Sequence, residues 1–109
     1  SLWRDEEFFG PSMAQFLALI SHTGSIQIAC RQMHMSYTKG WSMIREAGEQ
    51  LGFSILTTQS GGADGGFSQL TPKARDFLER YLAMDHALKL QEQKLFEIYF
   101  QEEDHETAF

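Results

Sequence analysis

Hydroxyl and cationic side chains that could read a nucleic acid are concentrated between residues 36 and 45, in the run SYTKGWSMIR. Hydroxyl groups can donate and accept hydrogen bonds at the base edges of a duplex, and they also bind phosphate oxygens. Lysine and arginine bind phosphates, and arginine also matches the paired acceptors of a guanine edge. The run therefore predicts contacts with double-stranded DNA through Ser36, Tyr37, Thr38, Lys39, Ser42 and Arg45.

Three residues of this run also have a purely structural interpretation. Ser36 is positioned to cap a helix through its hydroxyl, and a phosphate contact at the same helix N-terminus would come in addition. Tyr37 is either an outward reader or a core aromatic. Trp41 is assigned to the core, because it shares a helical spacing with Ile44 and Ala47.

No other set of side chains assembles a catalytic or metal-binding site. The four histidines are scattered, with no spacing that would converge two of them on a metal, and no Ser-His-acid set stands out. We therefore expect no enzymatic activity, no metal and no cofactor. Cys30 falls on the apolar side of a predicted helix, which favours a small core residue over a redox or catalytic role.

The composition bounds the class of protein. With 109 residues, of which 42% are hydrophobic, the chain can form a single domain with a substantial core. A single cysteine excludes an internal disulfide and fits a reducing compartment. No apolar run approaches the ~20 residues of a membrane helix, and no signal-peptide pattern is present. We expect a soluble, cytoplasmic protein.

The net charge of −6 opposes binding to DNA, since phosphate contacts need Lys and Arg. Its distribution weakens this objection. Residues 24–75 carry five cations against three acids, a net charge of +2, whereas residues 76–109 carry three cations against nine acids, a net charge of −6. The acidic residues are thus concentrated in the C-terminal part, and the candidate DNA-binding segment is locally positive.

Three helices are predicted to position the candidate residues. Apolar side chains at i, i+3, i+4 and i+7 indicate helices over 11–22 and 25–33, and a third helix over 36–51 carries the DNA-contacting candidates. Ser25 can cap the second helix, and glycines at positions 24 and 52 suit helix ends. The short turn between the second and third helices indicates a helix-turn-helix.

β-like segments follow the third helix. Residues 53–58 and 67–70 flank a segment with four glycines in six residues. A flexible hairpin tip fits this segment better than a phosphate-binding loop, because the Gly-Lys-Ser/Thr ending of that loop is missing. The resulting wing, over 53–70, is expected to place Thr58 and Ser60 against the DNA backbone or in the minor groove. Residues 2–9 are predicted to form a small N-terminal hairpin, and the alternative is a loose arm.

A long helix is predicted over 71–101, capped by Thr71, and Lys73 in its first turn is a further candidate for DNA contact. Its apolar positions alternate steps of three and four over roughly 36 Å, which favours a partner helix from a second copy. The alternative is a helix folded back on its own domain. Residues 102–109 are expected to form an acidic, solvated tail. The expected dimerisation residues are Phe77, Tyr81, Met84, Leu88, Leu95 and Ile98.

These segments together resemble the DNA-binding domain of the ModE-type, molybdate-responsive regulators, over roughly residues 8 to 95. The frame from the third helix to the start of the long helix is also similar to the LysR-type helix-turn-helix. The wing departs from the ModE pattern, because Ala63-Asp64 stands in the region where a lysine is usual. The resemblance rests on Gly24-Ser25-Ile26, Met35-Ser36-Tyr37 followed by Trp41, the wing residues 60–66 and Leu70-Thr71-Pro72.

The resemblance implies a mainly α fold with a small β component, in which a winged helix-turn-helix over 1–70 precedes a long dimerisation helix. It also implies a transcriptional regulator that binds a palindromic DNA operator as a homodimer, here without the molybdate-binding domains of full-length family members. The acidity and the long apolar helix leave an alternative open. In that alternative the winged helix is a protein–protein interaction or assembly module that does not bind DNA.

Overall fold

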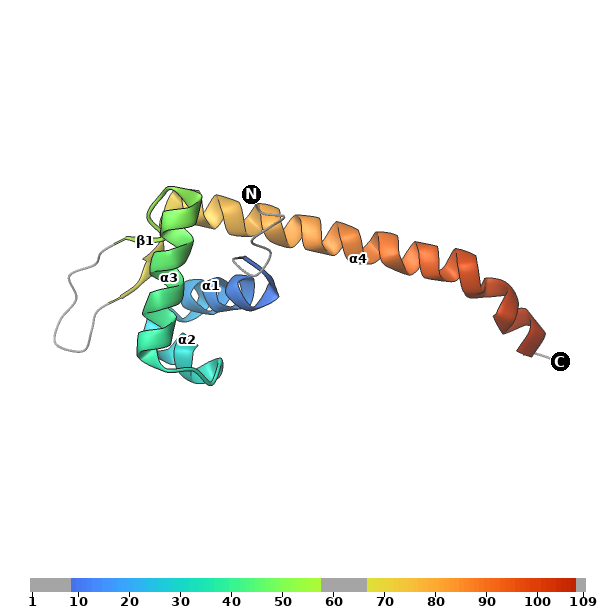
Figure 1. Cartoon of the computed structure of the whole chain (residues 1–109), viewed down its shortest axis with the longest axis horizontal. Helices are drawn as coiled ribbons and strands as arrows, with labels where there is room; N and C mark the ends of the chain where they lie inside the picture. The colour runs from blue at the N-terminus through green and yellow to red at the C-terminus, as the bar shows by residue number, and fades with distance from the viewer. Residues whose placement is uncertain (1–8, 58–66, 108–109) are drawn as a thin grey trace. The chain divides into compact units, whose positions relative to one another are not determined.

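The computed structural model describes residues 9–57 and 67–107, with side chains as far as Gln101. Its elements are, in order, α1 (Pro11–Thr23), α2 (Ile26–Gln32), α3 (Tyr37–Leu51), β1 (Leu56–Thr57), β2 (Gln69–Leu70) and α4 (Pro72–Thr107) (Figure 1). The chain divides into two compact units, Ser1–Glu79 and Arg80–Phe109, which are described separately. The predicted hairpin over residues 2–9 lies outside the described residues, apart from the buried Phe9.

Backbone conformation and local hydrogen bonds mark the ends of the helices at the glycine and serine residues that the sequence indicated. Pro11 occupies the start of α1, and Gly24 ends that helix in the left-handed conformation with φ of 72°. The Ser25 hydroxyl accepts a hydrogen bond from the Ile28 N–H at 3.0 Å and thereby caps α2. Gly52 ends α3 with φ of 85°, a conformation that L side chains rarely adopt.

The core of the first unit lies where α1 packs against α2 and α2 packs against α3. Phe16, Leu17 and Ile20 of α1 are fully buried, as their spacing predicts. α2 contributes Ile26, Ala29 and Cys30, and α3 contributes Ile44 and Ala47.

The assignment of Trp41 to this core is wrong. Its side chain is 38% exposed, and the neighbouring Gly40 is buried in its place. A Cβ atom on Gly40 would collide with the Cys30 Sγ atom and lie 3.0 Å from the Phe16 ring. α3 therefore packs closely through Gly40, where a side chain would force Cys30 and Phe16 to shift, and the indole lies one position further round the helix. The core alternative for Tyr37 is also wrong, because this side chain is 53% exposed.

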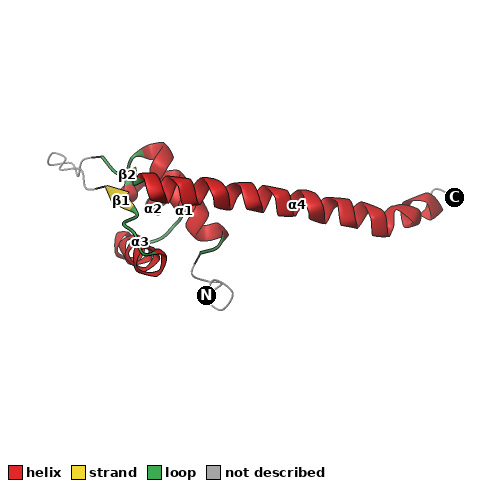
Figure 2. Ribbon diagram, turned by 90° about the horizontal axis from the view of Figure 1, so that it is seen from above, coloured by secondary structure: helices red, strands yellow, loops and turns green. Residues whose placement is uncertain are grey.

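The wing begins as a two-stranded antiparallel sheet, in which Leu56 pairs with Leu70 and Thr57 pairs with Gln69 (Figure 2). The strands are shorter than the β-like segments over 53–58 and 67–70. Beside the strands, the Thr71 N–H donates to the Ile55 carbonyl and its hydroxyl donates to the Ser54 carbonyl. The predicted wing tip lies outside the described residues. The predicted winged helix-turn-helix, mainly α with a small sheet, is confirmed.

The first turns of α4 belong to the first unit. The Thr71 hydroxyl accepts a hydrogen bond from the Ala74 N–H at 3.1 Å, as expected of a helix cap. Ala74 and Leu78 are buried, and the Phe77 ring packs edge-to-face on Phe9 with centroids 4.8 Å apart. With this packing, the first compact unit extends to Glu79, past residue 70, where the winged helix-turn-helix is predicted to end.

The second unit consists of the remainder of α4, which continues to Thr107 rather than ending near residue 101. Part of the expected acidic tail is therefore helical. Residues 101–107 contain no glycine or proline that would end the helix, and glutamate and glutamine are good helix formers. Asp85 and Lys89 form an ion pair one turn apart, with 3.0 Å between Oδ2 and Nζ. Among the described residues, no helix is long and apolar enough to cross a membrane.

Candidate nucleic-acid interface

The turn between α2 and α3 is held by backbone hydrogen bonds to the end of α2. His34 adopts the left-handed conformation with φ of 59°, and its N–H donates to the Arg31 carbonyl at 3.1 Å. The Met35 N–H donates to the Cys30 carbonyl at 3.0 Å. These bonds close the turn within four residues, so the start of α3 is fixed directly against the end of α2.

Ser36 caps α3, as predicted. Its hydroxyl accepts a hydrogen bond from the Lys39 N–H at 3.0 Å, and the residue itself is exposed. The start of α3, where the helix would enter a DNA groove, is therefore exposed over residues 36–39. Unpaired N–H groups at a helix N-terminus favour an anion such as a phosphate.

α3 has one buried and one exposed face. Gly40, Ile44 and Ala47 are buried at spacings of four and three. Thr38, Ser42 and Arg45 are exposed and also lie at spacings of four and three, which places them on one face of the helix, away from the core. These three residues form the reading face of α3.

The reading face continues into an acidic residue that the sequence analysis did not single out. Glu49 lies four residues after Arg45 and is exposed, and Glu46 is exposed beside it. With Lys39 also exposed, α3 carries two cations and two acids, a net charge of zero. In the part of the chain that the structure describes, no ion pair involves Arg45 or Lys39. Both cations are available to an external anion.

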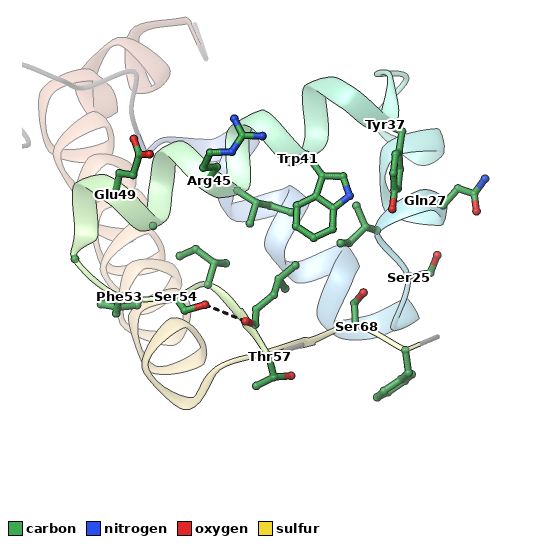
Figure 3. Close-up of a pocket in the computed structure, with 17 residues that line it drawn as sticks. Ser25, Gln27, Tyr37, Trp41, Arg45, Glu49, Phe53, Ser54, Thr57 and Ser68 are labelled. Carbon is green, nitrogen blue, oxygen red and sulfur yellow. Dashed lines mark hydrogen bonds between the residues drawn. The ribbon is translucent and has the colours of Figure 1, made fainter. Parts of the chain in front are cut away.

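A groove of about 730 Å³ lies beside the reading face, between α3, the start of α2 and the wing strands (Figure 3). Its apolar lining includes Tyr37, Trp41, Ile44, Phe53, Leu56 and Phe67. Figure 3 shows the indole of Trp41 directed into the groove, whereas the guanidinium of Arg45 points away from its floor. The edge of α3 toward the wing is therefore aromatic, and the adjoining face is polar.

The spacing between α2 and α3 depends on the contact of Cys30 with Gly40. The thiol is buried, which confirms the predicted small core residue. Burial raises the pKa of Cys30, and a backbone hydrogen bond with Gly40 opposes part of that rise. A thiol in this environment stays protonated and unreactive at neutral pH.

The remaining predicted DNA contacts do not join this cluster. Thr58 and Ser60 lie outside the described residues. Lys73 is exposed in the first turn of α4, which Thr71 attaches to Ser54, just beyond the C-terminal end of α3. α3 is roughly 22 Å long. Lys73 is therefore remote from Ser36 and Thr38 at the other end of that helix.

The predicted dimerisation residues differ in their surroundings. Phe77 contacts Phe9 within its own unit, and Tyr81 is half-buried. Four others are exposed: Met84 (52%), Leu88 (59%), Leu95 (45%) and Ile98 (67%). The described part of the chain contains no group of three or more His, Cys, Asp or Glu side chains that could hold a metal ion.

No protein-family model matches the chain. The chain is similar to the molybdenum-pterin-binding protein MopB of Rhodobacter capsulatus, with 32% identity over 76 residues, which are 70% of this chain and 28% of MopB. It is also similar to the molybdenum transport protein ModE of Herbaspirillum seropedicae, with 34% identity over 74 residues, which are 68% of this chain and 26% of ModE. The chain thus spans about a quarter of the length of these relatives.

One solved structure supports the fold. The crystal structure of ArgP from Mycobacterium tuberculosis, a LysR-type winged-helix protein, aligns with a TM-score of 0.57 and 23% identity, over 84% of this chain and 31% of ArgP. Identity at this level shows the fold alone. Together with the two sequence relatives, it confirms the expected resemblance to a ModE-type and LysR-type helix-turn-helix domain.

Proposed function

We propose that this chain, whose first unit is a ModE-like winged helix-turn-helix domain, is a sequence-specific DNA-binding regulator of transcription. α3 enters the major groove and presents its N-terminal part to the base edges, and the wing lies against the adjacent backbone. The proposal is supported by the relatives, which include a ModE protein, and by the fold. The role is one of binding, with no catalytic step.

The observation that carries this proposal is the polarity of α3. Its reading face offers the hydroxyls of Thr38 and Ser42 and the guanidinium of Arg45, all exposed and opposite the buried Ile44. Hydroxyls bind several base edges, and arginine binds the O6 and N7 atoms of guanine in a bidentate manner. Ser36 and Lys39 lie beside this face and are placed to bind phosphates, which position the helix without reading sequence.

The neutral charge of α3 sets the expected balance between affinity and specificity. Phosphate neutralisation supplies most of the sequence-independent affinity and makes binding depend on salt. With Glu46 and Glu49 on the same helix as Lys39 and Arg45, this contribution is small. We therefore expect weak non-specific binding and a shallow salt dependence, so that base contacts and the pairing of two domains supply most of the affinity.

We further propose that the regulator is a homodimer that binds a palindromic operator. Met84, Leu88, Leu95 and Ile98 are exposed on α4. With Gln91 they follow steps of four, three, four and three residues, which is the spacing of a helix–helix seam. A second copy would cover these side chains. Two reading helices related by a two-fold axis would then bind half-sites about one helical turn apart.

Selection of bound sequences from a random DNA pool tests this proposal, at low salt and at near-physiological salt. An enriched two-fold palindrome is the expected result. Arg45→Ala and Lys39→Ala should each weaken binding to the selected duplex. The matched control is Lys94→Ala, which removes the same charge from an exposed position on α4. Absence of binding at either salt would contradict the proposal and favour a protein–protein interaction module.

A further inference from the structure

Two large aromatic side chains are exposed on the edge of α3 next to the reading face. Tyr37 is 53% exposed and Trp41 is 38% exposed. Their rings pack edge-to-face, with centroids 6.3 Å apart and planes at 81°. This geometry is typical of a favourable aromatic pair. The pair therefore presents a large, mainly apolar aromatic surface beside the polar reading face.

The position of the pair follows from helical geometry. Trp41 lies three residues after Thr38 and four residues before Arg45, so it adjoins both ends of the reading face on the helix surface. It lies on the side of α3 that lines the groove toward the wing (Figure 3). When α3 lies in a major groove, this edge faces one wall of that groove, where a DNA strand passes between helix and wing.

A major groove offers few apolar partners to such a surface. The four bases present hydrogen-bond donors and acceptors there, and the one apolar group among them is the C5-methyl of thymine. This methyl lies toward the sugar–phosphate wall of its own strand. We infer that the Tyr37–Trp41 pair recognises thymine in the operator through its C5-methyl group. This inference rests on the proposed function and adds a chemical specificity to it.

The competing occupant of the same surface is deoxyribose, which is also apolar in part. Contact with sugars would be the same for every sequence and would contribute affinity alone. Contact with a methyl group is specific to thymine, because adenine, guanine and cytosine lack that group. An experiment that removes the methyl group and leaves the rest of the duplex unchanged therefore distinguishes contact with thymine from contact with deoxyribose.

The experiment uses the whole chain and the duplex recovered by selection. Each thymidine is replaced in turn by deoxyuridine, which lacks only the C5-methyl and keeps the same hydrogen bonds. Competition band shifts give the relative affinities. At one or two positions in each half-site, the replacement should weaken binding roughly fourfold, the effect of one buried methyl group. If no replacement changes the affinity, the inference is overturned while the proposed function stands.

Protein variants then assign the contact to the pair. Trp41→Gln should abolish the preference for thymine over uracil at those positions, whereas Tyr37→Phe, which keeps the ring, should retain it. Phe67→Gln removes an exposed aromatic side chain from the same groove outside α3 and is the matched control, with the preference unchanged. Urea unfolding of each variant checks that the domain is folded. A full thymine preference in Trp41→Gln would overturn the inference, and failure of selection itself would instead contradict the proposed function.

Discussion

At the scale of single residues, Ser36 combines a structural and a proposed functional role. Its hydroxyl accepts the Lys39 N–H and is exposed at the start of α3. Removing such a cap generally costs about 1 kcal/mol of the free energy of unfolding. Aspartate would keep the cap and add a negative charge at the point where we expect a phosphate.

We predict that Ser36→Ala lowers the free energy of unfolding by about 1 kcal/mol, measured by urea denaturation. Ser36→Asp should keep the stability and weaken binding to the selected duplex in band shifts, because its carboxylate repels the phosphate. Ser36→Thr is the control for both measurements. Unimpaired DNA binding by Ser36→Asp would place the phosphates away from the N-terminus of α3.

Cys30 gives a pH dependence at the same scale. Burial raises its pKa in the folded protein, so deprotonation costs more in the folded state than in the unfolded state. The thiol therefore contributes stability that is fully present below the unfolded pKa and is lost as the pH rises through the folded pKa. We predict that the stability advantage of the natural chain over Cys30→Ala decreases between pH 7 and pH 10.

The comparison of the two chains isolates the thiol, because every other titrating group is common to the natural chain and the Cys30→Ala variant. Urea denaturation at a series of pH values gives the difference in the free energy of unfolding. A difference that stays constant over this range would mean that the thiol titrates as freely in the folded protein as in the unfolded chain.

At the scale of elements, the helices of the first unit could be predicted because each has apolar residues at helical spacing and a residue typical of a helix start at its N-terminus. Phe16, Leu17 and Ile20 show this for α1, and the hydroxyls of Ser25 and Ser36 mark helix starts with a specific hydrogen bond. These signals are local in the sequence, so they can be recognised without knowledge of the tertiary contacts.

The orientation of α3 could be predicted only in part. Residues 40 and 41 both lie about one turn before Ile44, and an apolar pattern prefers the tryptophan to the glycine. Gly40 is buried in place of Trp41 because α3 lies close to Cys30 and Phe16 of the neighbouring helices. This tertiary contact cannot be read from the apolar pattern of α3 alone. The exposed aromatic edge of the candidate site follows from that same approach, so it could not be predicted either.

Gly40 provides a test of this packing between α2 and α3. Alanine would raise the helix propensity by up to about 1 kcal/mol, but its Cβ would overpack the contact at a cost of about 1–3 kcal/mol. We predict that Gly40→Ala lowers the free energy of unfolding, and that adding Cys30→Ala restores part of the loss. Strict additivity of the two changes in urea denaturation would show that the residues do not share this contact.

At the scale of the whole molecule, the proposed pairing with a second copy depends on the exposed apolar residues of α4. Leu88 and Leu90 have similar exposures, 59% and 50%, but only Leu88 lies on the predicted seam. Non-specific association of apolar surfaces would involve both leucines, whereas a helix–helix seam would bury Leu88 and leave Leu90 exposed. The two positions therefore form a matched pair.

If the proposed dimer forms, Leu88→Asp should convert it to a monomer in sedimentation experiments, whereas Leu90→Asp should leave it a dimer, because only position 88 lies on the proposed seam. The monomer should bind the palindromic duplex much more weakly than the dimer, since it engages a single half-site. Equal effects of the two substitutions would contradict the proposed seam.

A missense mutation in codon 40 replaces Gly40 with a larger residue. Every amino acid other than glycine carries a Cβ atom, so every missense change of this codon places a carbon atom against the Cys30 sulfur and the Phe16 ring. Alanine adds only this atom and is therefore the mildest replacement, whereas a larger side chain must also displace its surroundings. We expect the loss of stability at position 40 to increase with the size of the new side chain.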